Sequence, residues 1–150
     1  MKEPDGAGAS AFPAPENPLL DHLAIRLVRW DVGLAAFTLA VEPRHLNLQR
    51  RLQGGVVATM LDVACGYAGL RLEPDKPPVS GVTLMLNTAY SASVSAGTVT
   101  ATGRVVGGGR RIYFATGEVL AEDGTLIASA QGAFRRASSP ADHSRPPARG

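Results

Sequence analysis

Residues 54–72 read GGVVATMLDVACGYAGLRL, and this stretch decides the fold because no other segment of comparable length has a helical pattern of apolar residues. Its periodicity of about 100° per residue predicts one long helix with two distinct faces. One face carries the apolar side chains of a core stripe: Val56, Val57, Met60, Ala64 and Tyr67. The opposite face is almost entirely small, with one carboxylate in its middle: Gly55, Ala58, Thr59, Asp62, Cys65, Gly66 and Gly69. Small side chains let a backbone or a ligand approach closely, so we expect this second face to be covered.

Extended segments are expected on both sides of this helix. A short helix at residues 19–23 comes first in the chain. It is followed by six segments with the composition and alternation of strands, at residues 25–30, 34–41, 79–90, 98–106, 111–121 and 125–135. Glycine-containing turns favour an antiparallel meander for the last four. One central helix followed by such a meander indicates an α+β domain, and the length of the strands indicates a strongly curved sheet.

The length and composition limit the chain to one domain. It has 150 residues, of which 45% are apolar and 19% are charged, as in globular proteins. Both ends are rich in proline and small residues without an apolar period, which predicts disordered tails at 1–18 and 137–150 around a folded domain at 19–136. No apolar run is long enough for a membrane span, and residues 1–10 lack the apolar core of a secretory signal. We therefore expect a cytoplasmic protein that does not bind a membrane.

Several classes of function are disfavoured by what the chain lacks. Its single cysteine, Cys65, excludes an internal disulfide and a multi-cysteine zinc site. The three histidines have no metal-ligand spacing, and no phosphate-binding glycine motif follows a strand, so neither a metal nor a cofactor is expected. The net charge is only +2, the arginines are scattered and aromatic residues make up 5%, which argues against nucleic-acid binding. Cys65 itself is expected to be an inert residue of the helix.

Asp62 is the candidate for chemistry on the predicted helix. No other charged residue occurs between residues 56 and 69, and the residues one turn away from Asp62 are small or weakly polar. A carboxylate in such surroundings has its charged form disfavoured and becomes a candidate base or nucleophile. From the residue pattern alone, a catalytic and a structural role are about equally favoured.

The second candidate is the start of the same helix, Gln53-Gly54-Gly55. Unpaired backbone N–H groups at a helix N-terminus, together with the helix dipole, suit an anion or a developing oxyanion. A simple joint between loop and helix is an equally open interpretation. Gly54 and Asp62 lie about two helical turns apart, so they can address one ligand only with help from outside the helix, which a symmetric partner could supply.

Residues 47–62, NLQRRLQGGVVATMLD, resemble the signature of the hotdog-fold acyl-CoA thioesterases of the PaaI type. In that family an Asn, a His-Gly-Gly step and a Leu-Asp pair recur in this order and at this spacing. The resemblance continues through residues 82–87, Gly97 and the Asp123-Gly124 turn, and covers roughly residues 17–136. It implies a hotdog fold, in which a curved antiparallel sheet wraps around the long central helix.

The resemblance also implies a role for each matching residue. Asp62 would be the catalytic carboxylate, acting as general base on water or as nucleophile. The N–H group of Gly54 would polarise the thioester carbonyl, and Asn47 would position that carbonyl or the water. Thr83 would orient the attacking water, with Ser80 as a nearby alternative. No metal and no cofactor takes part in this chemistry.

The same resemblance implies an assembly of subunits. Each site would be shared across a homodimer, with Asp62 and Thr83 from one subunit and Asn47 and Gly54 from the other, and two dimers could form a tetramer. Gln53 and Gly55 would contact the acyl-CoA substrate. Gln53 stands where the family usually has histidine. A glutamine can donate and accept hydrogen bonds but does not titrate near neutral pH, so an acid role at this position is not expected.

Two rival functions remain beside the thioesterase. A hotdog hydratase or dehydratase needs a histidine next to the carboxylate, and none occurs in residues 54–72. A hotdog module that binds acyl-CoA without cleaving it stays open as the alternative, although Asp62 argues against it. The acyl group is not indicated by the sequence.

Overall fold

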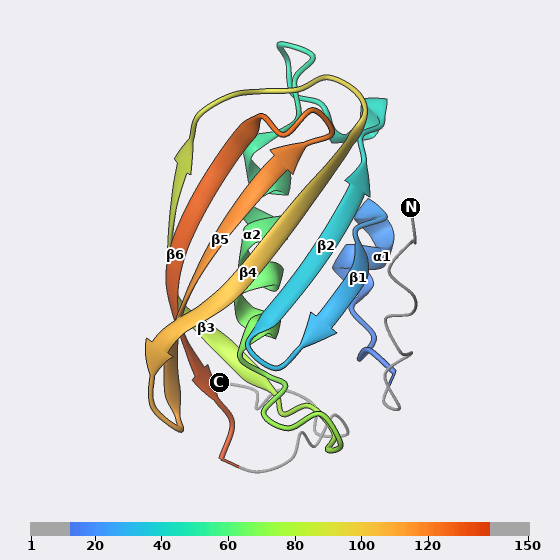
Figure 1. Cartoon of the computed structure of the whole chain (residues 1–150). Coiled ribbons are helices and arrows are strands. Elements are labelled where there is room, and N and C mark those ends of the chain that lie inside the picture. Colours follow the sequence, from blue (N-terminus) through green and yellow to red (C-terminus); the bar gives the residue numbers. More distant parts are fainter. Residues whose placement is uncertain (1–12, 139–150) are drawn as a thin grey trace, which may run out of the picture.

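The computed structural model describes residues 13–138 and consists of two α-helices, one short 3-10 helix and a six-stranded sheet (Figure 1). The helices are α1 (Pro18–Leu23), η1 (Pro43–His45) and α2 (Gly54–Ala68). The strands are β1 (Arg26–Asp31), β2 (Leu34–Ala40), β3 (Gly81–Tyr90), β4 (Thr98–Gly108), β5 (Ile112–Ala121) and β6 (Leu126–Arg136). The predictions of disorder for residues 1–12 and 139–150 lie outside the described residues.

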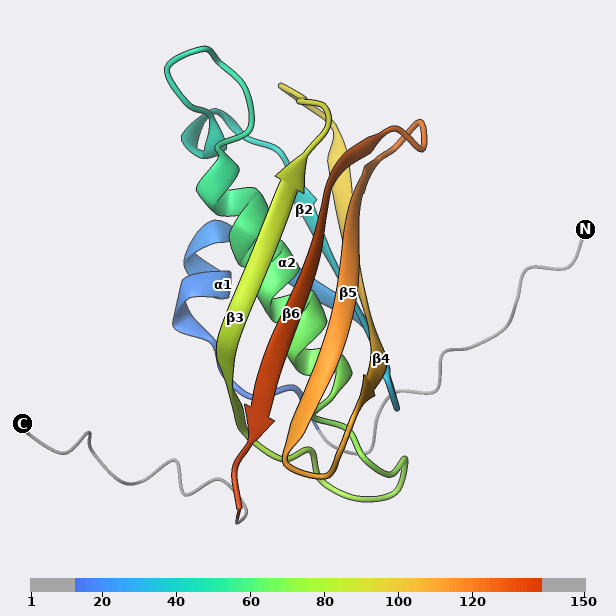
Figure 2. The same cartoon turned by 90° about the vertical axis from the view of Figure 1, so that its left-hand side faces the viewer.

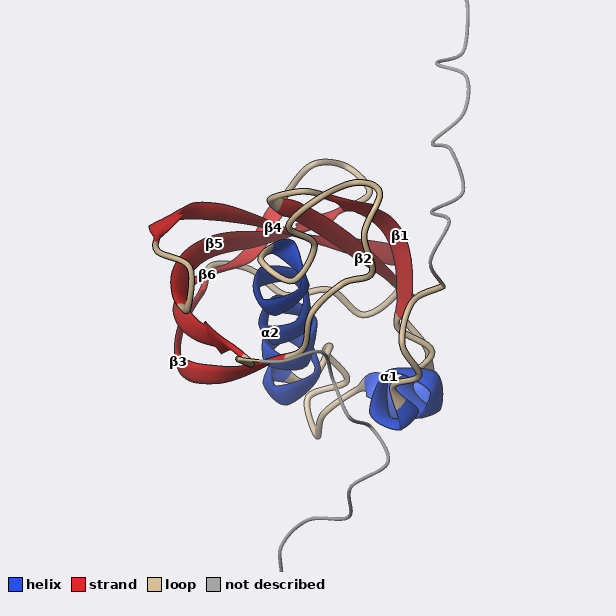
Figure 3. Cartoon of the chain, turned by 90° about the horizontal axis from the view of Figure 1, so that it is seen from below, coloured by secondary structure: helices blue, strands red, loops and turns tan. Residues whose placement is uncertain are grey.

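All neighbouring strands are antiparallel, in the order β1-β2-β4-β5-β6-β3. The sheet curves around α2, which lies against its concave face (Figures 2 and 3), and α1 lies on the same side of the sheet as α2, toward the β1 end (Figure 3). This is the hotdog fold, so the predicted α+β class, the long central helix and the curved antiparallel sheet are confirmed. Within the described residues, no helix is long and apolar enough to cross a membrane.

The predicted meander is wrong for one strand, because β3 pairs with β6 and not with β4. Alternation along a strand tells which face is buried but does not name the neighbouring strand. Residues 91–97 carry the chain across the end of the sheet. The N–H of Ser91 bonds to the Ile127 carbonyl at 2.8 Å, and the Gly97 carbonyl accepts from the N–H of Val41 at 2.9 Å. As a result β3 stays at the open edge beside β6, while β4 joins β2.

The predicted helix also ends earlier than expected, at Ala68 instead of Leu72. Gly69 caps it, and a Cβ atom at Gly69 would lie 2.1 Å from the ring of Tyr113. The Tyr113 hydroxyl donates to the carbonyl of Gly66 at 2.5 Å. The ring of Tyr113 thus occupies the space that a side chain at residue 69 would need, and the helix ends there.

The small-residue face of α2 is covered largely by the chain's own sheet, so most of the expected covering is supplied within one chain. Cys65 is fully buried, and its Sγ would lie 2.7 Å from a Cβ at Gly117. The Ala64 carbonyl oxygen would lie 2.2 Å from a Cβ at Gly103, which pairs directly with Gly117 across β4 and β5. The first half of this face, which includes Asp62, remains at least partly exposed, as does Gly66 near its end.

Candidate active site

Asp62 and Thr83 form one half of the candidate site. Asp62 is partly buried on α2, and the Thr83 hydroxyl on β3 donates to its Oδ1 at 2.6 Å. Thr83 faces the helix because it pairs with the inward-facing Phe134 of β6. Ser80 precedes β3, where its backbone carbonyl accepts from the N–H of Ala137 at 2.9 Å, and among the described residues the hydroxyl that bonds to Asp62 is that of Thr83. We name Asp62 and Thr83 the acid half-site.

Asn47 lies in the loop before α2, which stands out at one end of the molecule (Figures 1 and 2). Its Oδ1 accepts from the backbone N–H groups of Gln49 at 3.0 Å and Arg51 at 3.1 Å. Because backbone N–H groups only donate, these two bonds identify the accepting side-chain atom of Asn47 as its oxygen. The oxygen of Asn47 is therefore used to shape the loop. Among the described residues, no hydrogen bond is found at its Nδ2.

The first turn of α2 offers backbone donors next to this loop. Gln53 is the N-cap but makes no side-chain cap bond, and within residues 13–138 the N–H groups of Gly54 and Gly55 have no partner. The space beside Gly55 is open. The carbonyl of Gly54 accepts from the Tyr90 hydroxyl of β3 at 2.7 Å, which ties the helix start to the sheet edge. We name Asn47 and Gly54 the amide half-site.

Tyr90 is a site residue that the sequence analysis missed. It contacts Gly54 across 36 positions in sequence, and no local pattern marks it. The resemblance identified the residues before and within α2, but the contacts of β3 follow from which strand forms the edge of the sheet. The meander prediction gave β3 the wrong neighbour, β4 instead of β6.

The two half-sites of one chain do not meet. Asp62 and Gly54 are eight residues apart on one helix, which corresponds to about 12 Å along its axis at about 1.5 Å per residue. A single thioester carbonyl cannot contact donors and a carboxylate that far apart. One chain therefore presents two separate halves of a site.

The half-sites both lie near strand β3, which is an edge of the sheet. Within the described residues β3 pairs only with β6. Its ten residues contain no charged side chain, and its large apolar side chains are about half exposed: Val82, Leu84, Met85 and Tyr90. The other edge, β1, has six residues, three of them charged. Short length and charged side chains keep an edge strand from pairing with another strand, and β3 is neither short nor charged.

Cys65 adds no nucleophile to this site. Burial, and to a lesser extent the negative charge of Asp62, raise the pKa of its thiol to about 12, so the thiolate is not formed near neutral pH. Among the described residues, no three histidine, cysteine or acidic side chains come together as metal ligands. A hollow of about 650 Å³ lies on the outer face of the sheet, lined by residues of β3 to β6, and contains none of the predicted site residues.

Comparison with known proteins decides the family. The sequence profile of the thioesterase superfamily matches residues 51–128, which include the start of α2, Asp62 and Thr83. The chain belongs to the thioesterase superfamily. This thioesterase is a thioester hydrolase of the hotdog fold, as the resemblance in its sequence predicted. No protein of curated function matches it in sequence.

Solved structures share the fold of this thioesterase. The PaaI protein from the phenylacetic acid degradation operon of Escherichia coli is 22% identical with a TM-score of 0.75, covering 83% of this chain and 87% of that one. A variant of the phenylacetic acid degradation protein PaaI from Thermus thermophilus is 26% identical with a TM-score of 0.70, covering 81% and 100%. A thioesterase from Haemophilus influenzae is 21% identical with a TM-score of 0.72, covering 83% and 86%.

Proposed function

We propose that the protein is an acyl-CoA thioesterase, which hydrolyses an acyl- or aryl-CoA thioester to the free acid and CoA. The observation that supports this best is the 2.6 Å hydrogen bond from Thr83 to Asp62. A hydroxyl and a carboxylate at this distance can hold a water molecule or orient the carboxylate itself for attack. In a thioester hydrolase, a partly buried carboxylate so held is a suitable reactive group.

In the proposed reaction, Asp62 takes a proton from water while the water oxygen attacks the thioester carbonyl carbon. Alternatively, an Asp62 oxygen attacks first and water then hydrolyses the resulting anhydride. In both routes the carbonyl oxygen becomes an oxyanion, which the N–H of Gly54 and the amide of Asn47 stabilise. The carbon–sulfur bond then breaks, and CoA leaves as a thiolate that takes up a proton.

The site is complete only in a homodimer, in which each acid half-site meets the amide half-site of the other subunit. The uncharged open edge of β3 is the surface for this pairing, since an added strand would satisfy its free backbone groups. The loop that carries Asn47 fits the same arrangement: its neighbour Leu48 is 96% exposed, an apolar side chain without cover in one chain. Two such dimers could form a tetramer, and we expect the enzyme in the cytoplasm, without nucleic-acid or membrane partners.

The test is release of CoA from a panel of aliphatic and aromatic acyl-CoA esters by the wild type and by Asp62→Asn. The substitution keeps the shape of the side chain, and a positioned general base contributes about 10²- to 10⁴-fold in rate, so kcat falls at least about 100-fold. Asp75→Asn, in an exposed loop, is the matched control and keeps wild-type kcat. An Asp62→Asn enzyme with a tenth or more of wild-type kcat contradicts the proposal, and tight acyl-CoA binding without release favours the non-catalytic module.

A further inference from the structure

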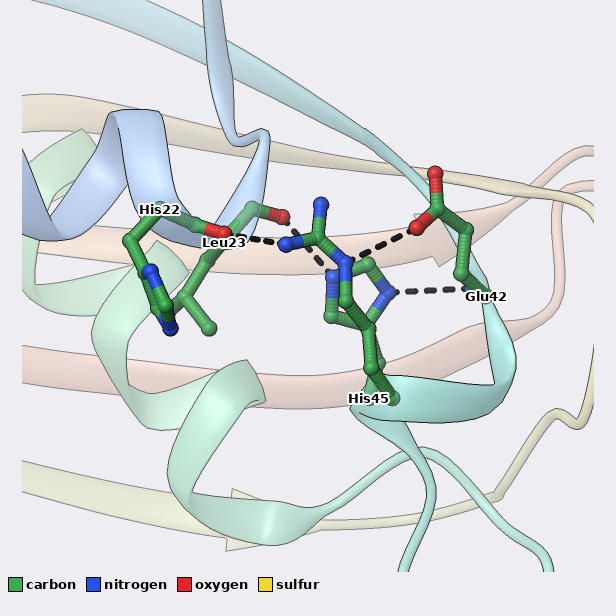
Figure 4. A network of polar contacts seen from close by, with 5 residues as sticks. His22, Leu23, Glu42 and His45 are labelled. Carbon is green, nitrogen blue, oxygen red and sulfur yellow. Dashed lines mark hydrogen bonds and ion pairs between the residues drawn. The ribbon is translucent and has the colours of Figure 1, made fainter.

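His45 is a buried ionisable group that the proposed reaction does not use. Its side chain is 1% exposed, between η1 and the junction of α1 with β1 (Figure 4). The backbone N–H of Glu42 donates to its Nδ1 at 3.0 Å, so Nδ1 carries no proton. The proton is then on Nε2, which donates to the carbonyl of Leu23 at 2.8 Å. Both ring nitrogens are used, in a single neutral tautomer.

The main chain of the same residue holds the amide half-site. The carbonyl of His45 accepts from the N–H of Gln53 at 2.9 Å, and Gln53 is the N-cap of α2. Asn47 is two residues further along the chain, in a loop closed by the pairing of Leu46 with Leu52. The imidazole therefore anchors residues 46–54 to α1 and η1, and this segment carries both Asn47 and Gly54.

The acid half-site has separate supports. Thr83 is held by the pairing of β3 with β6, and Asp62 lies two turns into α2, where the helix packs on Gly103 and Gly117. None of the contacts of His45 in the described residues reaches either of them. A loss at His45 should therefore affect one half of the site and spare the other.

We propose that His45 is a positioning residue for the amide half-site: its imidazole sets where Asn47 and the Gly54 N–H lie, without touching the substrate. This rests on the proposed thioesterase function. The amide groups act on the oxyanion, which exists only after attack, so their displacement lowers kcat more than it raises KM. A displacement of about 1 Å can cost about 100-fold in rate.

Two variants each keep one of the ring contacts. The side-chain oxygen in His45→Asn can still accept from the N–H of Glu42, and the amide nitrogen in His45→Gln can still reach the carbonyl of Leu23. Both keep a partner for one buried backbone group, which favours folding. We expect kcat to fall about 10- to 100-fold in each, with KM within about three-fold. Arg44→Met is the control, since its exposed guanidinium contacts His22 and Glu42 at the same junction, and its kcat stays within about three-fold.

Mixed dimers separate positioning from general damage to the subunit. A His45 variant refolded with an equal amount of Asp62→Asn gives about half heterodimers. Each heterodimer has one site with both halves intact, so about a quarter of wild-type activity returns. The pair Asp62→Asn with Asn47→Ala is the reference, and its mixed dimers should recover the same quarter of wild-type activity. Refolding a His45 variant with Asn47→Ala restores nothing, because both chains are damaged in the amide half-site. Equal recovery with both partners, or recovery with neither, overturns the proposal.

Hydrogen exchange gives a readout that needs no substrate, so it distinguishes failure of this proposal from failure of the proposed function. In both His45 variants, amide exchange should accelerate in residues 46–56 and stay unchanged in residues 81–90. Unchanged exchange in residues 46–56, or acceleration that spreads to residues 81–90, overturns the positioning role. A wild-type kcat in both variants also overturns the positioning role of His45.

Discussion

The hydrogen bond between Thr83 and Asp62 is the contact on which the proposed chemistry depends most directly. It joins a strand to the central helix across 21 positions in sequence. A hydroxyl that donates to one carboxylate oxygen leaves the other free to accept from water, so in the proposed reaction Thr83 sets the orientation of Asp62. Thr83 is exposed in one chain, which leaves its position open to a substrate and to a second subunit.

Thr83→Val should lower kcat while leaving the fold unchanged, because valine has nearly the same shape and lacks the donor. A hydrogen bond to a charged group contributes about 1.5–3 kcal/mol, which corresponds to about 10- to 100-fold in kcat. Thr83→Ser keeps the hydroxyl and should stay within about five-fold of wild type. Steady-state kinetics of the two variants checks this, and equal kcat values for Val and Ser would show that the hydroxyl is not used.

Adjacent arginines show what the sequence does not reveal at this scale. Arg135 is exposed, whereas Arg136 is buried, stacks 4.3 Å over the ring of Tyr113 and donates to the carbonyls of Gly69 and Gly109. The guanidinium of Arg136 therefore serves the fold, which its place in the sequence does not indicate. Alternation places the two on opposite faces, but the carbonyls that make burial of the guanidinium possible come from the end of α2 and from the turn between β4 and β5.

At the scale of the elements, α2 can lie close to the sheet because β4 and β5 carry paired glycines beneath it. A Cβ at Gly103 would lie 2.2 Å from the carbonyl oxygen of Ala64, which is backbone and cannot rotate away. The sequence predicted the helix and the strands, because each depends on local periodicity. It did not predict that the small residues of the helix face these glycines, since that depends on how two elements 40 residues apart are packed.

Gly103→Ala should therefore destabilise the fold, by about 1–3 kcal/mol or more, because overpacking forces the helix to move. Gly107→Ala in the same strand is the matched control: its Cβ would meet nothing within 4 Å, and its stability should change by less than about 1 kcal/mol. Urea unfolding of both variants measures the difference. Equal midpoints would show that α2 does not rest on β4 at this glycine.

At the scale of the molecule, the site residues and the assembly are linked through β3. The resemblance named Asp62, Thr83, Asn47 and Gly54, and the chain places the first two in contact. Gly54 lies about 12 Å from Asp62 along α2, and Asn47 lies in the loop before that helix. Pattern and spacing cannot say which strand forms the edge, because that follows from the pairing of β3 with β6. Once β3 is at the edge, its uncharged length makes it the surface on which we propose that a second copy pairs.

Met85→Glu, in the middle of β3, should therefore give a monomer that has lost thioesterase activity while the chain remains folded. Pairing of two copies along this edge would bring the two charges near each other in a desolvated interface, and each monomer would keep both half-sites but no complete site. Val28→Glu places the same charge at a similarly exposed apolar position on the opposite edge strand, β1, and should leave both the dimer and kcat unchanged. Light scattering at micromolar concentration, with CoA release from the same samples, measures both effects. Two results would contradict this prediction: an active wild-type monomer, or dissociation by Val28→Glu together with no effect of Met85→Glu. Either result would place the subunit contact elsewhere and leave the two half-sites of one chain without the partner that the proposed reaction requires.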